Sequence, residues 1–194
     1  TKKEIELIEQ EATSDGFISE MLTGAAANES NVKKLKSPAV LHLATHGEFN
    51  QLSSADTYLK SKRILAGAAD PEPLKVTDFT LYEDGFLTAY EVTQLELSET
   101  RLVVLSACET GLGEIQGNEG VYGLQRAFKI AGAKYLIMSL WQVPDKQTSQ
   151  LMTAFYRNWL EQKMSIPEAF RSAQKEMRDL GLEPYKWAGF VLVE

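Results

Sequence analysis

The stretch A-V-L-H-L-A-T-H-G, residues 39–47, decides how this chain is expected to fold. Residues 39–45 are apolar nearly throughout, as in a strand that a parallel sheet buries on both faces, and Gly47 ends the run. Three more apolar runs, at residues 102–107, 135–141 and 187–193, predict further strands. The sheet is therefore expected to form from segments spread over most of the chain.

Helical patterns fill the intervals between these strands. Thr88 with Glu91, and Ser165 with Glu168, form capping boxes that predict two helix starts, and Gly181 predicts the end of the second helix. The other expected elements are helices at residues 5–12, 28–35 and 120–130, a helix from Asp145 as its N-cap to about residue 160, and a possible strand at residues 17–22. Strands that alternate with helices predict an α/β fold with a mainly parallel sheet covered by helices on both faces.

The composition is that of an ordinary folded domain. The chain has 194 residues, 44% of them hydrophobic and 24% charged, which fits one domain. A net charge of −7 argues against nucleic-acid binding, because phosphate contacts need clustered Lys and Arg. The apolar runs are far shorter than the roughly 18 residues of a membrane span, and no signal peptide is visible. A single cysteine allows no intrachain disulfide, so a cytoplasmic protein is expected.

Two further expectations concern the least regular stretch and the limits of the chain. Residues 51–84 contain Pro71 and Pro73 with several Gly and Asp, and they predict a long surface insertion with strand pieces near residues 79–81. Because the sequence starts at Thr1 rather than Met, we expect it to be a piece excised from, or processed out of, a longer protein.

His46 and Cys108 each follow a predicted strand directly. In open α/β sheets the chemistry lies outside the carboxyl ends of the strands, so both side chains are expected at one edge if the strands are neighbours. A histidine there can take the thiol proton and favours the nucleophilic thiolate, and the backbone N–H groups of Gly47 and Cys108 would face a developing oxyanion. Cys108 can equally be a small hydrophobic residue buried in the core, and His46 a core histidine whose hydrogen bonds are satisfied. His42 lies inside its strand and is expected to be structural.

The sequence lacks the motifs of other cysteine-dependent sites and of glycine-rich nucleotide-binding loops. A cysteine phosphatase needs an arginine six residues after the cysteine, where this chain has Glu114. A thioredoxin-like site needs a second cysteine, and this chain has only one. A zinc site needs a cluster of several Cys and His, whereas the chain has one cysteine and two histidines in total. The glycine-rich loop at residues 111–120 lacks the GxGxxG spacing and carries Glu119 as well. We therefore expect neither a metal nor another cofactor. Nucleotide binding at this glycine-rich loop is kept as an alternative function.

Seven segments together resemble the CHAT family, which belongs to the clan of caspases, separases and gingipains. The two signature blocks are L-H-L-A-T-H-G at residues 41–47 and L-V-V-L-S-A-C-E-T-G-L-G at residues 102–113. The other matching segments follow in order: G-F-L-T-A-Y-E-V (85–92), G-L-Q-R-A-F (123–128), S-L-W-Q-V-P-D (139–145), L-M-T-A-F-Y (151–156) and W-A-G-F-V-L (187–192). Residues 51–84 are the main departure.

The resemblance implies a caspase-like α/β sandwich in which the histidine and cysteine strands are adjacent and His46 and Cys108 form a catalytic dyad. It implies a cysteine endopeptidase that needs no cofactor and cleaves a protein or peptide substrate. It also implies a regulatory partner, either TPR repeats before this domain or an activator protein, and a role in prokaryotic defence or regulated cell death. Because some family members are inactive scaffolds, a catalytically silent interaction domain is the alternative.

The run W-Q-V-P-D, residues 141–145, adds an expectation about specificity. A similar Trp-x-Val-x-Asp run occurs in separases, where the aspartate lines the pocket for an arginine before the scissile bond. By this resemblance Asp145 selects Arg, or less well Lys, because a guanidinium can pair a carboxylate in bidentate fashion. The same aspartate also suits the N-cap of the next helix, so both interpretations stay open.

Overall fold

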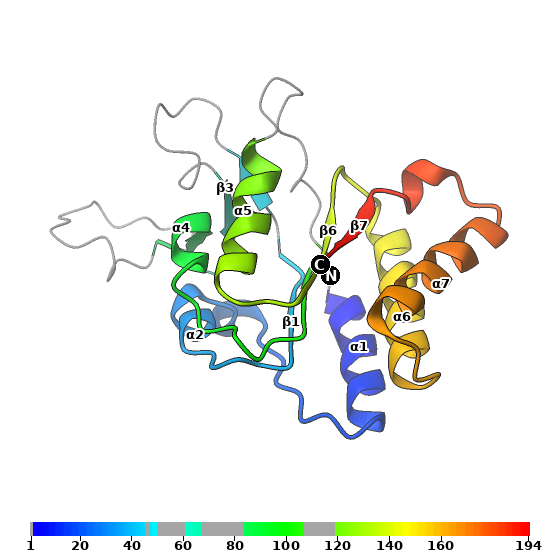
Figure 1. The fold of residues 1–194 in the computed structure, drawn as a ribbon, viewed down its shortest axis with the longest axis horizontal. Helices are drawn as coiled ribbons and strands as arrows, with labels where there is room; N and C mark the ends of the chain where they lie inside the picture. The colour runs from blue at the N-terminus through cyan, green and yellow to red at the C-terminus, as the bar shows by residue number, and fades with distance from the viewer. Residues whose placement is uncertain (1, 46, 50–60, 67–83, 107–118) are drawn as a thin grey trace, which may run out of the picture.

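A four-stranded sheet in the order β1-β5-β6-β7 forms the centre of the computed structural model, which describes residues 2–45, 47–49, 61–66, 84–106 and 119–194 (Figure 1). The strands are β1 (Val40–Leu43), β5 (Leu102–Leu105), β6 (Tyr135–Ser139) and β7 (Phe190–Val193). The first three run parallel, and β7 pairs with β6 in the antiparallel sense. The predicted α/β fold with a mainly parallel sheet is confirmed.

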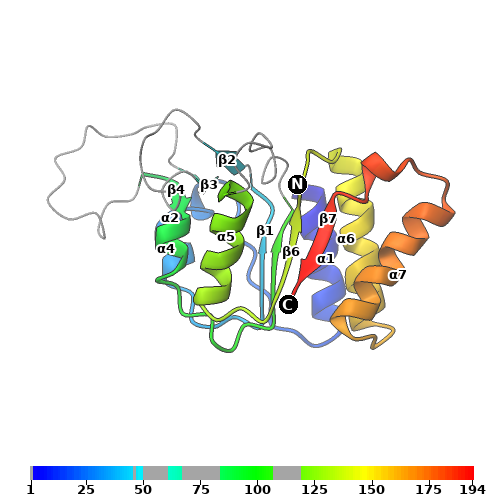
Figure 2. The same cartoon turned by 45° about the horizontal axis from the view of Figure 1, so that its top comes forward.

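Helices cover both faces of this sheet, which explains why its strands are apolar along their whole length (Figure 2). On one face lie α1 (Lys2–Ser14), α6 (Asp145–Leu160) and α7 (Ile166–Asp179), and on the other lie α2 (Glu29–Lys33), α4 (Ala89–Val92) and α5 (Glu119–Ile130). All four β5 side chains are 0% exposed. Leu102 and Val104 belong to the core under α6 and α7, whereas Val103 and Leu105 belong to the opposite core. Full burial of each such side chain stabilises the fold by roughly 1.5–3 kcal/mol.

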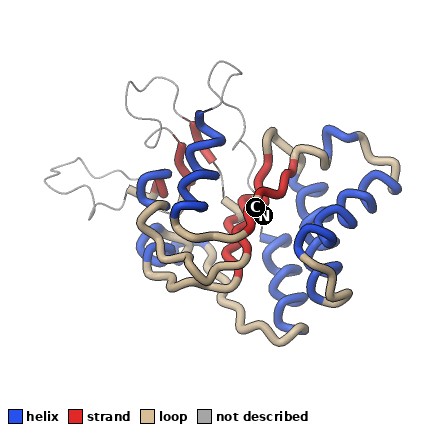
Figure 3. The backbone as a smooth tube through the Cα atoms, viewed as in Figure 1, coloured by secondary structure: helices blue, strands red, loops and turns tan. Residues whose placement is uncertain are grey.

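A second, antiparallel sheet of three strands lies beside the helices of the α5 face (Figure 3). It consists of β2 (Gly47–Phe49), β3 (Ser61–Ile64) and β4 (Phe86–Thr88), in the order β2-β3-β4. Strand β3 lies within the stretch expected as a surface insertion, and Leu65 directly after it is buried in the core. The strand pieces predicted at residues 79–81 lie outside the described residues.

The helix boundaries follow the local signals in the sequence. Both predicted capping boxes are present, with Thr88 and Ser165 as N-caps. The Glu91 carboxylate accepts hydrogen bonds from the Thr88 backbone N–H at 2.8 Å and from its hydroxyl at 2.7 Å. Helix α7 ends at Asp179, and Gly181 follows with a φ of +71°, a conformation that glycine adopts without strain.

A buried ionic cluster connects α2 to the start of α4. The Glu29 side chain is 1% exposed, and its Oε2 accepts a hydrogen bond from the Gly85 N–H at 3.2 Å. Lys33 pairs with Glu29 and, at 2.9 Å, with Glu91. Burial, together with the neighbouring Glu91, raises the pKa of Glu29 to about 7. Burial also opposes ionisation of Glu91, but hydrogen bonds with Glu29 and Thr88 hold its pKa below the usual value.

Three local predictions are wrong. Residues 17–22 form no strand and pair with no described strand. Asp145 is not an N-cap: Pro144, with an extended ψ of 137°, takes that position, so Asp145 is the first residue of α6. Strand β7 begins at Phe190 rather than at residue 187, because residues 187–189 form a turn that continues from the 3₁₀ helix Pro184–Lys186.

Candidate active site

The carboxyl ends of β1 and β5 lie side by side. The two strands pair in register, with Leu43 opposite Leu105, and the Ser106 N–H donates to the Leu43 carbonyl at 3.2 Å. In the sequence, His46 and Cys108 are each the third residue after one of these paired leucines. Both lie outside the described residues, so the dyad itself stays a prediction. The strand arrangement on which it depends, two adjacent parallel strands that end level, is present.

A buried polar cluster lies at the same end of the sheet, on the face covered by α1 and α6. Nδ1 of His42 is 3.0 Å from the Tyr156 hydroxyl, and its Nε2 is 3.1 Å from both a Glu4 carboxylate oxygen and the Ser106 hydroxyl. All four residues are largely buried, and the His42 side chain is 9% exposed. Burial, and secondarily the charge of Glu4, raises the pKa of Tyr156 well above its usual value.

The hydrogen-bonding capacity of this cluster fixes the role of His42. A carboxylate only accepts hydrogen bonds, so Nε2–H donates to Glu4, while Nδ1 pairs with the Tyr156 hydroxyl, which can donate or accept. Both ring nitrogens thus have hydrogen-bond partners inside the core, in keeping with the structural role predicted for His42. Sequence reasoning missed its three partners. The available signal was the histidine itself, since a polar residue inside a doubly buried strand requires hydrogen-bond partners.

The loop after β6 carries Asp145 to the same edge of the sheet, because β6 is the other neighbour of β5. The loop is held by Trp141, whose indole N–H donates to the Tyr185 carbonyl at 2.8 Å and whose ring stacks on Tyr185. Gly189 lies against the indole, and a Cβ there would come within 2.8 Å of the ring. Asp145 is exposed in the first turn of a 16-residue helix, where the helix dipole favours an anionic side chain.

Gly47, the other predicted contributor to an oxyanion site, is the first residue of β2. Its backbone pairs with Arg63 of β3 in the antiparallel sheet. Strand β2 therefore starts immediately after the position of His46 in the chain. The chain thus leaves the large sheet after Leu43 and enters the small sheet at Gly47.

The described part of the chain contains neither a cluster that could hold a metal ion nor a helix that could span a membrane. No group of three or more His, Cys, Asp or Glu side chains is arranged to hold a metal ion there. None of the helices described is both long and apolar enough to cross a membrane.

Comparison with known proteins identifies the family. A family model described as "CHAT domain" matches residues 1–194, the whole chain. The chain is also 33% identical over 140 residues to tetratricopeptide repeat protein 28 of Mus musculus and 32% identical over 140 residues to the protein of the same name in Homo sapiens. Each match covers 71% of this chain but only 6% and 5% of those much longer proteins. The full-length match and the mostly parallel sheet between two helical layers agree, and this chain belongs to the CHAT domain family, part of a cysteine peptidase-like clan.

Proposed function

We propose that this CHAT domain is a cysteine endopeptidase in which Cys108 is the nucleophile and His46 the general base. The observation that carries the proposal is the level ending of β1 and β5, with each of these residues three positions beyond a paired leucine. Two loops that leave adjacent parallel strands at the same height can bring an imidazole and a thiol to one substrate carbonyl.

The proposed reaction follows from these groups. His46 accepts the thiol proton, and the thiolate attacks the carbonyl carbon of the scissile peptide bond. Backbone N–H groups of Gly47 and Cys108 stabilise the oxyanion, and the imidazolium returns its proton to the leaving amine. Water then hydrolyses the thioester that joins the acyl group to Cys108. No step requires a metal or cofactor.

We assign the choice of substrate residue to Asp145. The loop that carries it leaves β6 beside β5, and the Trp141–Tyr185 stack holds that loop. An exposed carboxylate near the scissile bond selects a cationic residue before that bond, with Arg favoured over Lys because it can bind in bidentate fashion.

We further infer that a partner controls the enzyme. The curated relatives are named for tetratricopeptide repeats, and the domain matches only a small part of each. A TPR region in the same protein, or a separate activator protein, is the proposed regulator, in a cytoplasmic protein of prokaryotic defence or regulated cell death. The same naming favours the second candidate function, a catalytically silent domain that serves protein interaction.

A thiol-reactive peptide probe with arginine next to its warhead separates the two functions. If the domain is a peptidase, intact-mass measurement shows one added probe on the wild type, none on Cys108→Ala and far slower addition on His46→Ala. Circular dichroism checks that both variants remain folded. Iodoacetamide is the control reagent, because it reports an accessible thiol without needing a substrate pocket. A wild type that reacts with iodoacetamide but not with the peptide probe supports the silent domain instead.

A further inference from the structure

Ser106 holds the end of β5 to the end of β1 by two contacts. It directly follows Leu105, the last residue of β5, and it is buried, with 5% of its surface exposed. Its backbone N–H donates to the Leu43 carbonyl at 3.2 Å, and its hydroxyl oxygen lies 3.1 Å from Nε2 of His42. The backbone and the side chain of one residue thus tie together the carboxyl ends of both strands.

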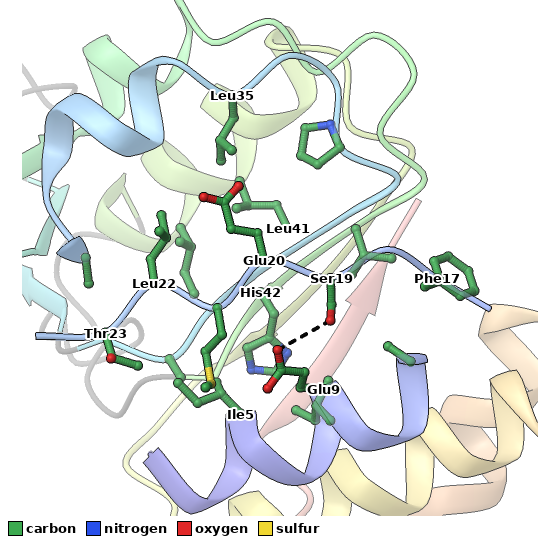
Figure 4. Close-up of a pocket in the computed structure, with 18 of the residues that line it drawn as sticks. Ile5, Glu9, Phe17, Ser19, Glu20, Leu22, Thr23, Leu35, Leu41 and His42 are labelled. Carbon is green, nitrogen blue, oxygen red and sulfur yellow. Dashed lines mark hydrogen bonds between the residues drawn. The ribbon is translucent and has the colours of Figure 1, made fainter. Parts of the chain in front are cut away.

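The imidazole of His42 is oriented from outside the sheet, by α1. His42 projects from β1 toward this helix (Figure 4), whereas Leu41 before it belongs to the core on the opposite face. Nε2 of His42 lies 3.1 Å from a carboxylate oxygen of Glu4, which is 2% exposed. Because Nε2–H donates to Glu4, the Ser106 oxygen at the same distance is a second acceptor for that proton. Glu4 therefore fixes the edge of the ring that meets Ser106.

The two ring nitrogens of His42 contact different parts of the fold. Nδ1 lies 3.0 Å from the hydroxyl of Tyr156 on α6, and the Tyr156 ring packs against Phe155 and Trp159 in the core of that face. Nε2 contacts Glu4 and Ser106 instead. The contact at Nδ1 thus joins the sheet to a helix, whereas the contact at Nε2 joins one strand end to the other.

The Nε2 contact lies close in the chain to both residues of the proposed dyad. Cys108 is two residues after Ser106, and His46 is four residues after His42. A polypeptide advances at most about 3.6 Å per residue, so two residues span no more than about 7 Å. A displacement of Ser106 is therefore passed to Cys108 with little slack. An error of about 1 Å in the position of a reacting group can slow a reaction by about 100-fold.

We propose that His42, with its imidazole oriented by Glu4, is a positioning residue of the peptidase that acts on Cys108 through Ser106. The inference rests on the proposed function and deepens it, because it gives a role in the reaction to side chains that touch no substrate. His42 holds the ends of β1 and β5 at a fixed separation, so that the thiol of Cys108 and the imidazole of His46 reach the same carbonyl. Burial of the cluster strengthens its hydrogen bonds and so limits movement of the two strand ends.

A purely structural role of the same cluster has a different consequence. If the cluster served only to satisfy a buried histidine, each variant would lose reactivity in step with its loss of stability, whichever nitrogen had lost its partner. The positioning role instead makes the reaction depend on the partners of Nε2 and not on the partner of Nδ1.

A matched pair of substitutions separates the two nitrogens. In His42→Gln the amide nitrogen takes the place of Nε2, and its two protons can serve both Glu4 and Ser106, while the contact with Tyr156 is lost. In His42→Asn the shorter amide takes the place of Nδ1 and can keep only the contact with Tyr156. The measurement is the rate at which the arginine peptide probe labels each protein, followed by intact mass over a range of probe concentrations. It yields a maximal labelling rate and a half-saturating probe concentration.

The maximal rate should follow the Nε2 contacts. His42→Gln should label within about 3-fold of the wild-type rate, and His42→Asn roughly 100-fold more slowly. Ser106→Ala, which deletes the hydroxyl alone, should be slower by roughly 10-fold or more. The half-saturating concentration should stay the same in all three variants, as expected of groups that act only on the reacting step. Tyr156→Phe should lose stability in urea but keep the wild-type rate.

Ser165→Ala is the matched control for Ser106→Ala. It also deletes one serine hydroxyl, the N-cap of α7, but at the opposite end of the sheet, to which α6 leads from the carboxyl end of β6 (Figure 2). It should lower stability in urea without changing the labelling rate. Circular dichroism at the labelling temperature checks that every variant is folded.

The outcomes distinguish failure of this inference from failure of the proposed function. A wild type that does not react with the probe refutes the peptidase, and the positioning role with it. If the wild type reacts and Ser106→Ala reacts equally fast, the positioning role alone is refuted. The same conclusion follows if His42→Gln and His42→Asn are slowed equally, or if the variants change the half-saturating concentration rather than the maximal rate.

Discussion

The buried carboxyl of Glu29 should make the stability of this domain fall as the pH rises from about 4.5 to about 7. Its pKa is about 7 in the folded state against 4.5 for an ordinary glutamate, so between these values the folded protein holds a proton that the unfolded chain releases. The stabilisation is complete below pH 4.5 and is lost as the pH passes 7. A shift of this size corresponds to about 3 kcal/mol at 1.36 kcal/mol per pH unit. Glu91, whose pKa is lowered, acts in the opposite sense and only below pH 4.5.

Replacing the carboxyl by an amide isolates this contribution. In urea unfolding followed by tryptophan fluorescence at pH 5, 6, 7 and 8, Glu29→Gln should lack most of the fall seen in the wild type. Glu96→Gln is the matched control, since Glu96 is an exposed carboxylate that also pairs with a lysine, Lys36, and such surface pairs contribute at most about 1 kcal/mol. If Glu29→Gln loses stability over this range as steeply as the wild type, the assignment of the titrating group to Glu29 is refuted.

Three further predictions test the core, the backbone and the proposed specificity. Tyr156→Phe removes the hydroxyl 3.0 Å from His42 and should lower the free energy of unfolding by about 1 kcal/mol, whereas His42→Ala leaves three buried groups without a partner and should cost about 3 kcal/mol in urea unfolding. Gly132→Ala should cost about 2 kcal/mol or more by the same assay, because its φ is +109° and its Cβ would lie 2.8 Å from the Ser98 backbone. If the proposed peptidase is active, Asp145→Asn should lower kcat/KM for arginine substrates by roughly 30-fold to several thousand-fold, and far less for substrates with an apolar residue there.

Each of these has an outcome that would contradict it. Equal stability of Tyr156→Phe and the wild type would mean that the hydroxyl adds nothing to the His42 cluster. Gly16→Ala is the control for the glycine, since Gly16 has a φ of +83° but nothing within 4 Å of a Cβ, so it should cost clearly less than Gly132→Ala. A wild type that cleaves best after acidic or apolar residues would remove Asp145 from the pocket while leaving the dyad proposal intact.

The parts of the fold that the sequence predicts well are those set by local or uniform signals. The four β5 side chains are apolar because both faces of the strand are covered, and that pattern is visible without coordinates. The capping boxes at Thr88 and Ser165 are likewise local, since each hydrogen bond spans three residues. The parallel sheet and the helix starts could therefore be predicted.

Features that depend on distant partners could not be predicted in the same way. Residues 17–22 have the pattern of a strand, but pattern does not show whether a neighbour is present. Strand β3 was missed because its pairing with β2 and β4 joins segments on either side of irregular sequence. For the candidate site, the shared edge of β1 and β5 was predictable, whereas the contacts of His42 with Glu4 and Tyr156 are not, since they join residues 38 and 114 positions apart.

The strand order also has a consequence for the path by which this domain folds. The central pair, β5 and β6, joins residues about 30 positions apart, whereas the edge pairings of β1 with β5 and of β7 with β6 join residues about 60 positions apart. Doubling the length of a closed loop costs about 0.6 kcal/mol of chain entropy, and contacts between distant residues slow folding. The β5–α5–β6 unit is therefore expected to assemble first, with the edge strands added afterwards. β1, whose end leads toward His46, would then be among the last strands to form and among the first to separate in unfolding.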